Sequence, residues 1–248
     1  MIDREKDSRL SELIKIIVVT SKQMPEMIFS YFSNLDRNEK LKPFYNLYAE
    51  TFLSIYSFAT LYQNQAWSQA SAILRTGIEQ TSKIFVLTKN PQLLDEFLKL
   101  RALSDQLANL DSKEEKMQFI SMFDYSDLNE FNNFVEWSWV KPLCNVEMPT
   151  RNDVIRLANL GDTLVDIRNI LNAFVHGTLS TFDFYNASEN TEVLVRFGRR
   201  ISLICCKLFY LAYISFKNWK EVSSLTWDTD EYFAIFNSKY KFLVENYN

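Results

Sequence analysis

ISLICCKLFYLAYISF, residues Ile201 to Phe216, is the longest apolar stretch of the chain, and its length decides between two classes of fold. It has 16 residues and is interrupted by Lys207. A helix needs about 20 predominantly apolar residues to cross a bilayer, so this stretch is too short. The sequence therefore predicts a helix buried in a protein core rather than a membrane span.

The composition also favours helices. Of the 248 residues, 47% are apolar and 15% aromatic, and there are only 4 Gly and 5 Pro. Such a chain can build a large core, but it has too few glycine and proline residues for the many tight turns of a β-sandwich or barrel. With 27 Lys and Arg against 31 Asp and Glu, the net charge of −4 provides no global basic excess, so any contact with nucleic acid must be local.

Apolar residues recur at steps of three and four along most of the chain, which is the period of an amphipathic helix. Pro43 and Pro91 are placed to begin helices, and Pro25 is expected to kink or restart the first one. The predicted helices cover residues 8–32, 43–63, 66–88, 91–110, 150–160, 162–177, 191–219 and 229–247. We expect an all-α protein, a single helical bundle of about eight or nine helices over residues 1–248, with its core at about 43–219.

Residues 111–149 are the least regular part of the pattern. The segment begins with SKEEKMQFISMF, which is typical of a short helix start, and continues into a cluster formed by Trp137 and Trp139. We predict that it is an insertion or a lid-like segment over the helical core.

The cysteines and the amino-terminal sequence indicate the compartment. Cys144, Cys205 and Cys206 show no C-x-x-C or Cys/His spacing, so neither a metal nor another cofactor is expected. Cys205 and Cys206 lie within the apolar stretch and are predicted to be reduced core residues. The sequence MIDREKDSRLSEL alternates charges instead of placing a basic segment before an apolar one, which argues against a secretion signal. We expect a cytoplasmic protein that does not bind a membrane.

A polar stripe on the predicted helix 162–177 contains the first candidate site. Arg168, Asn172 and His176, the only histidine, are spaced four residues apart and fall along one side of a helix. Histidine transfers protons near neutral pH and the planar guanidinium of arginine binds phosphate, so the three residues suit a phosphodiester. Alternatively, His176 is only a helix cap and Asn172 faces solvent.

Arg75 and Glu79, four residues apart on the predicted helix 66–88, are the second candidate group. They form an ordinary exposed ion pair, or else both are buried and orient the polar groups of the His176 helix across the bundle. Glu79 is also spaced to pair with Lys83, and Gly77 would permit the close approach of another backbone. Burial distinguishes between these alternatives.

The motifs LRTGIEQ and FVHG, which contain members of these two groups, resemble the HEPN superfamily (higher eukaryotes and prokaryotes nucleotide-binding domains) and related helical families of abortive-infection type. The resemblance implies a homodimer in which an Arg, a neighbouring polar residue and a His of each subunit form a composite, metal-independent ribonuclease site. By motif position these are Arg168, Asn169 and His176. Seven residues separate Arg168 from His176, more than in the family motif. If this spacing excludes Arg168, Asn172 and His176 remain as a polar pair.

The resemblance implies a metal-independent endoribonuclease, or an RNA- or nucleotide-binding effector, of antiviral (phage) defence or toxin–antitoxin type, with an antitoxin or another protein as partner. Arg196, Arg199 and Arg200 form a local basic group that we expect to contact nucleic acid, unless they are ordinary solvated helix residues. The alternative function is that of a catalytically silent helical interaction or scaffold protein whose aromatic face binds a partner.

Overall fold

The computed structural model describes residues 2–33, 41–158, 162–175, 191–219 and 225–247. These ranges contain ten α-helices, two 3-10 helices and no strand, which confirms the predicted all-α class. No helix in them has the length and hydropathy that crossing a bilayer requires.

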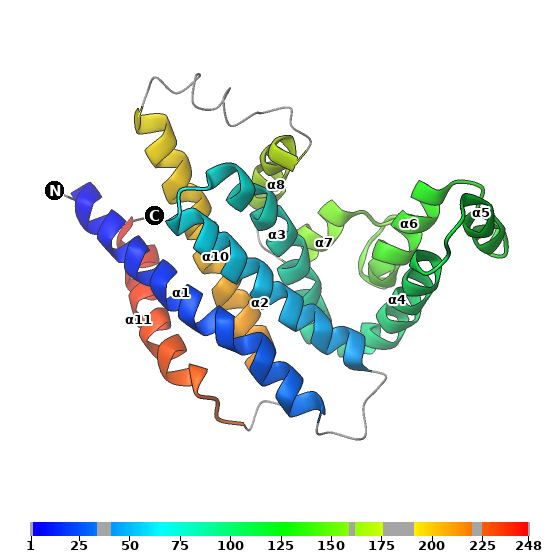
Figure 1. The fold of residues 1–248 in the computed structure, drawn as a ribbon, viewed down its shortest axis with the longest axis horizontal. Helices are drawn as coiled ribbons and strands as arrows, with labels where there is room; N and C mark the ends of the chain where they lie inside the picture. The colour runs from blue at the N-terminus through cyan, green and yellow to red at the C-terminus, as the bar shows by residue number, and fades with distance from the viewer. Residues whose placement is uncertain (1, 34–40, 159–161, 176–190, 220–224, 248) are drawn as a thin grey trace.

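Five long helices build the main bundle (Figure 1). The first three, α1 (Ile2–Ser33), α2 (Lys42–Gln63) and α3 (Trp67–Lys89), pack side by side in chain order. The fourth, α10 (Thr191–Lys217), packs against all three, and α11 (Thr229–Tyr247) lies along α1. Helices from the two ends of the chain therefore enclose a common core.

The apolar stretch at residues 201–216 lies within α10 and is buried, as predicted. Its position between three helices explains why apolar residues occur almost all round it rather than on one stripe. Cys205 and Cys206 are fully buried with free thiols, and burial raises the pKa of both. They are core residues, as their sequence context predicted.

Aromatic rings fill the space between α2, α10 and α11. Phe209 of α10 makes edge contacts with Phe52 of α2 and Phe236 of α11, and Tyr213 stacks on Phe233 with ring centroids 4.0 Å apart. Edge-to-face and offset stacked pairs contribute beyond the area that they bury. Many of the aromatic residues that enrich this composition therefore lie in the core.

The core extends beyond the expected limits of 43–219. Leu13 and Ile17 of α1 and Phe236 of α11 are fully buried members of the same hydrophobic cluster. In addition, α1 is one continuous helix through Pro25, where we expected a kink or a restart. The apolar face of α1 packs against α2, and α1 and α11 pack against each other.

Residues 111–149 are more regular than expected. After η2 (Pro91–Leu93) and α4 (Leu94–Ala108), the chain forms α5 (Lys113–Ser121), α6 (Leu128–Trp137) and η3 (Ser138–Leu143). A capping box between Ser112 and Glu115 starts α5, and the Asp127 carboxylate accepts two backbone N–H groups at the start of α6. Capping groups thus start both helices, although the apolar period is weak in α5 and strong in α6.

These short helices form an extension at one side of the main bundle rather than a cover over it (Figure 1). They bury a small second cluster made by Leu107, Ile120, Phe131 and Val135. Met122, which directly follows α5, is 68% exposed. The extension thus carries its own core and leaves this apolar side chain exposed.

Two helical glycines differ in the space beside them. A Cβ on Gly198 of α10 would lie 2.5 Å from Cζ3 of Trp67, whereas a Cβ on Gly77 of α3 would meet only the Leu208 side chain, at an ordinary 3.7 Å. Gly198, and not Gly77, is therefore the position where a close approach requires glycine, and the approaching group is an indole ring rather than a backbone.

We predict that Gly198→Ala lowers the free energy of unfolding by about 1–2 kcal/mol, because overpacking against a rigid ring outweighs the gain in helix propensity. Gly77→Ala is the matched control and should raise it by up to about 1 kcal/mol. Urea denaturation followed by circular dichroism measures both. A Gly198→Ala variant as stable as Gly77→Ala would contradict this packing.

Candidate functional site

The candidate site is built on α8 (Asp162–Val175), which packs against α3 and α7 (Arg151–Leu157). Leu164, Ile167 and Leu171 are buried and anchor α8 in the main core. This apolar stripe fixes the rotation of the helix, and it turns the Arg168 side chain toward Glu79 of α3. Helical spacing in the sequence predicts that Arg168 borders the apolar stripe, and the packing of α8 against α3 determines that its partner is Glu79.

Arg168 is buried, with 6% of the residue exposed, and it binds Glu79. Its Nε donates a hydrogen bond to Glu79 Oε1 at 3.0 Å, and its Nη2 lies 3.0 Å from the same oxygen. Its Nη1 donates to Oδ1 of Asn169 at 3.2 Å. The structure therefore joins three residues that the sequence analysis had placed in two separate groups.

Two more arginines reach the same carboxylate oxygen. Arg75 Nε lies 3.5 Å from Glu79 Oε1 along α3, and Arg151 Nε at the start of α7 lies 3.2 Å from it. Arg151 was not among the predicted site residues. The sequence marks Thr150 as a helix cap, but nothing in it shows that the next side chain crosses to α3. We call these residues, Arg75, Glu79, Arg151 and Arg168, the Glu79 cluster.

The Glu79 cluster has an excess of positive charge. Three guanidinium groups share one carboxylate, which leaves two unbalanced charges. Lys83 does not supply the alternative partner considered for Glu79, since it pairs with Glu136 and lies 4.5 Å above the Trp137 ring. Burial raises the pKa of Glu79, and Arg151 and Arg75 oppose this rise by stabilising the charged form. Unbalanced cations in a partly buried place attract an anion.

Several polar atoms of this region have unused hydrogen-bonding capacity. The Nε atoms of Arg75 and Arg151 and the Nη2 atom of Arg168 are within ion-pair distance of Glu79 but outside hydrogen-bond geometry. Asn172, one turn after Arg168, has a buried Oδ1 atom with no hydrogen-bond partner in the described part of the chain. The guanidinium N–H groups are donors suited to an oxyanion, whereas the Asn172 oxygen is an acceptor.

His176, the remaining member of the predicted stripe, lies outside the described residues, directly after the last residue of α8. Asn169 is exposed beside Arg168, and Asn172 is half-buried. The prediction that His176 acts with these residues therefore rests on the sequence and helical spacing alone.

The basic group on α10 is divided by the structure. Arg196 and Arg200 are exposed. Arg199 instead forms a bidentate ion pair with Asp7 of α1, with Nε–Oδ1 at 2.6 Å and Nη2–Oδ2 at 2.7 Å. Its role in binding nucleic acid stays a prediction, but in this conformation its guanidinium faces a carboxylate.

A metal site is not found in the described ranges, where no three His, Cys, Asp or Glu side chains come together in a suitable group. Arginine, which dominates the Glu79 cluster, has no lone pair to offer a metal at neutral pH and is a good anion ligand. The chemistry that this arrangement supports is the binding of a phosphate or a similar oxyanion.

We predict that Glu79→Gln lowers the free energy of unfolding by about 2 kcal/mol at pH 7, because it leaves three guanidinium groups without a counter-charge. Glu96→Gln is the control, since the Glu96–Lys99 pair is exposed and should contribute less than about 0.5 kcal/mol. Urea titrations in low salt compare the two variants. Equal small losses would show that solvent screens the Glu79 cluster.

Comparisons with family models, with curated proteins and with solved structures give no match to this chain.

Proposed function

We propose that this protein is a HEPN-like helical effector that binds RNA at the Glu79 cluster and cleaves it without a metal. The observation that carries the proposal is the convergence of Arg75, Arg151 and Arg168 on one carboxylate oxygen. A phosphate placed beside these guanidinium groups would balance the excess charge that Glu79 leaves. The cluster also includes the arginine of the motif that resembles the HEPN superfamily.

The proposed chemistry uses the 2′-hydroxyl of RNA as an internal nucleophile. Neutral His176 accepts its proton, or His176 in its protonated imidazolium form donates a proton to the leaving 5′-oxygen, and an arginine stabilises the charge that develops on the phosphorane. Arg151 is the most accessible arginine of the cluster, with 35% of its side chain exposed against 8% for Arg168. We therefore assign the first contact with the phosphate to Arg151, while Glu79 holds Arg168 in position on α8.

The remaining parts of the proposal follow from the same resemblance. Two subunits bring their α8 helices together in a homodimer in the cytoplasm. Arg196 and Arg200 contact the RNA backbone at a distance from the reacting phosphate. Activity of this kind fits antiviral defence or a toxin controlled by a cognate protein partner.

A catalytically silent interaction protein is the second candidate function. It is favoured by the extension formed by α4, α5 and α6 (Figure 1), which has its own small core and exposes Met122 directly after α5. In this alternative the Glu79 cluster is a structural link between α3, α7 and α8. The two functions differ in whether the cluster contacts RNA.

The deciding experiment is cleavage of a mixed RNA pool in the presence of EDTA. We predict that the wild type cuts and that His176→Ala reduces the rate by about 100-fold or more, the usual loss for a general acid–base group. Arg151→Ala should also reduce cleavage and weaken RNA binding, whereas Arg101→Ala on α4, outside the cluster, should do neither.

Circular dichroism and the mass in solution must be the same for all four proteins. Cutting that survives in His176→Ala would remove the proposed mechanism. Silence of the folded wild type, with no difference in RNA binding between Arg151→Ala and Arg101→Ala, would instead support the interaction protein.

A further inference from the structure

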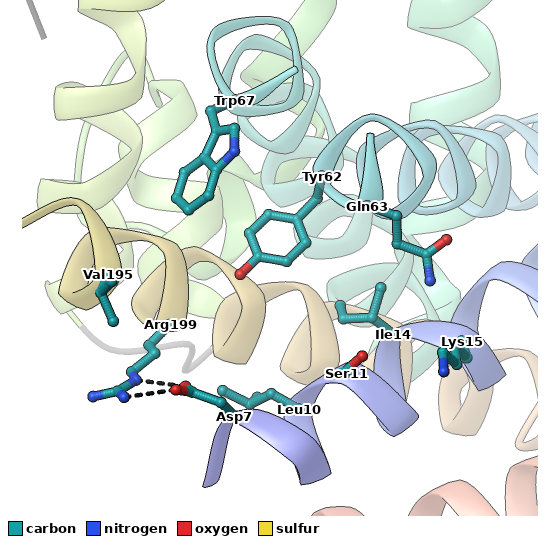
Figure 2. Close-up of a pocket in the computed structure, with 10 residues that line it drawn as sticks. All are labelled: Asp7, Leu10, Ser11, Ile14, Lys15, Tyr62, Gln63, Trp67, Val195 and Arg199. Carbon is teal, nitrogen blue, oxygen red and sulfur yellow. Dashed lines mark hydrogen bonds and ion pairs between the residues drawn. The ribbon is translucent and has the colours of Figure 1, made fainter. Parts of the chain in front are cut away.

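A second candidate site lies near the amino-terminal end of α10, where α1, α10 and the connection between α2 and α3 meet (Figure 2). It is a cavity of about 650 Å³, and no residue of the Glu79 cluster lines it. Its volume is within the range of pockets that hold small organic ligands, about 300–1,000 Å³. Because its lining is separate from the Glu79 cluster, ligand binding in this cavity does not depend on the proposed ribonuclease activity.

One half of this cavity is apolar and aromatic. Tyr62 and Trp67 form one wall, with ring centroids 5.4 Å apart, and Leu10 and Ile14 of α1 lie opposite them (Figure 2). Burial raises the pKa of Tyr62, and its hydroxyl is engaged with Ser202, so the protein itself uses the polar end of this ring. The ring faces and the aliphatic side chains remain to enclose a flat apolar group.

The aromatic wall is held in place before any ligand arrives. Trp67 packs directly against Gly198 of α10, where any larger residue would collide with its ring. The Asp7–Arg199 ion pair ties α1 to α10 at the same end of the cavity (Figure 2). Walls that are fixed in this way lose little conformational freedom on binding.

The other end of the cavity offers polar groups that the protein does not use. Ser11 and Lys15 of α1 and Gln63 of α2 line it, and none of them has a hydrogen bond or an ion pair with a described residue. Lys15 is also the unbalanced charge of the lining, because Arg199 faces Asp7. A hydroxyl, an amide and an ammonium group together suit a carboxylate or a phosphate.

We propose that this cavity binds a small aromatic anion, with its ring between Tyr62, Trp67 and Leu10 and its carboxylate or phosphate beside Ser11, Lys15 and Gln63. The aromatic half of the cavity favours a ligand with a ring. The ammonium group of Lys15, which has no ion pair among the residues described, favours a ligand with a negative charge. A neutral ligand of the same shape would fill the cavity without using Lys15, and a cation would be repelled by it.

Isothermal titration of the full chain with 2-naphthoate, 2-naphthyl phosphate and neutral 2-naphthalenemethanol tests the proposal. We expect both anions to bind more tightly than the alcohol, and their relative affinity tells a carboxylate site from a phosphate site. Lys15→Glu should weaken binding of the anions by about fivefold or more and leave binding of the alcohol unchanged. Lys22→Glu, the same charge reversal on α1 outside the cavity, should have little effect on any of them.

Ser11→Trp tests the location, because an indole at this exposed position of α1 would occupy the cavity. Binding of all three compounds should be lost while the circular dichroism spectrum stays that of the wild type. The proposal is overturned if the anions fail to bind, if they bind no better than the alcohol, if Lys15→Glu and Lys22→Glu weaken them equally, or if binding survives in folded Ser11→Trp.

Discussion

One carboxylate oxygen, Oε1 of Glu79, connects the three helices on which the candidate site depends. Arg75 is on the same helix as Glu79, but Arg151 and Arg168 reach it from α7 and α8. The latter two helices are short, at 7 and 14 residues, and isolated helices of such length are marginal in water. Their positions therefore depend on tertiary contacts: the apolar stripe of α8 supplies the packing energy, and Glu79 specifies the register.

The excess of positive charge distinguishes the Glu79 cluster from an ordinary structural ion pair. A buried pair is favourable only when attraction and hydrogen bonds offset the cost of desolvation, and a single carboxylate cannot provide good geometry to three guanidinium groups at once. The geometry of the cluster reflects this limit, since Arg168 Nε is the only guanidinium nitrogen of the four residues that makes a hydrogen bond to Glu79. A purely structural network would be more stable with a second carboxylate. The missing negative charge is what an anionic ligand would provide.

The sequence was sufficient for the parts of the fold that depend on local pattern. The length and apolarity of residues 201–216 predicted a buried helix, whereas the spacing of Arg75 and Glu79 left open whether this pair is exposed or meets the polar stripe of the helix that contains Arg168. The structure brings these three residues together. It does not include His176 among the described residues, so the proton-transfer role stays a prediction.

The features that could not be predicted are those set by packing between distant segments. Arg151 follows an ordinary capping threonine, and only the approach of α7 to α3 makes it part of the Glu79 cluster. The cavity beside α10 combines residues separated by almost two hundred positions, from Asp7 to Arg199, and none of them belongs to a recognisable motif. In residues 111–149, capping by Ser112 starts α5 despite its weak apolar period, and capping by Asp127 starts the strongly amphipathic α6.

The two candidate sites differ in whether a bound ligand must compete with contacts that already exist in the protein. At the Glu79 cluster, Arg168 is already held by a carboxylate, so a ligand must add to this arrangement through Arg75 or Arg151 or must compete with Glu79 for the guanidinium. At the cavity, the ion pair closes one end and the ligand meets polar groups at the other. Binding there requires no exchange of partners. The cavity is thus the preorganised site, whereas access to Arg168 at the cluster is coupled to the electrostatic contact that holds α8 against α3.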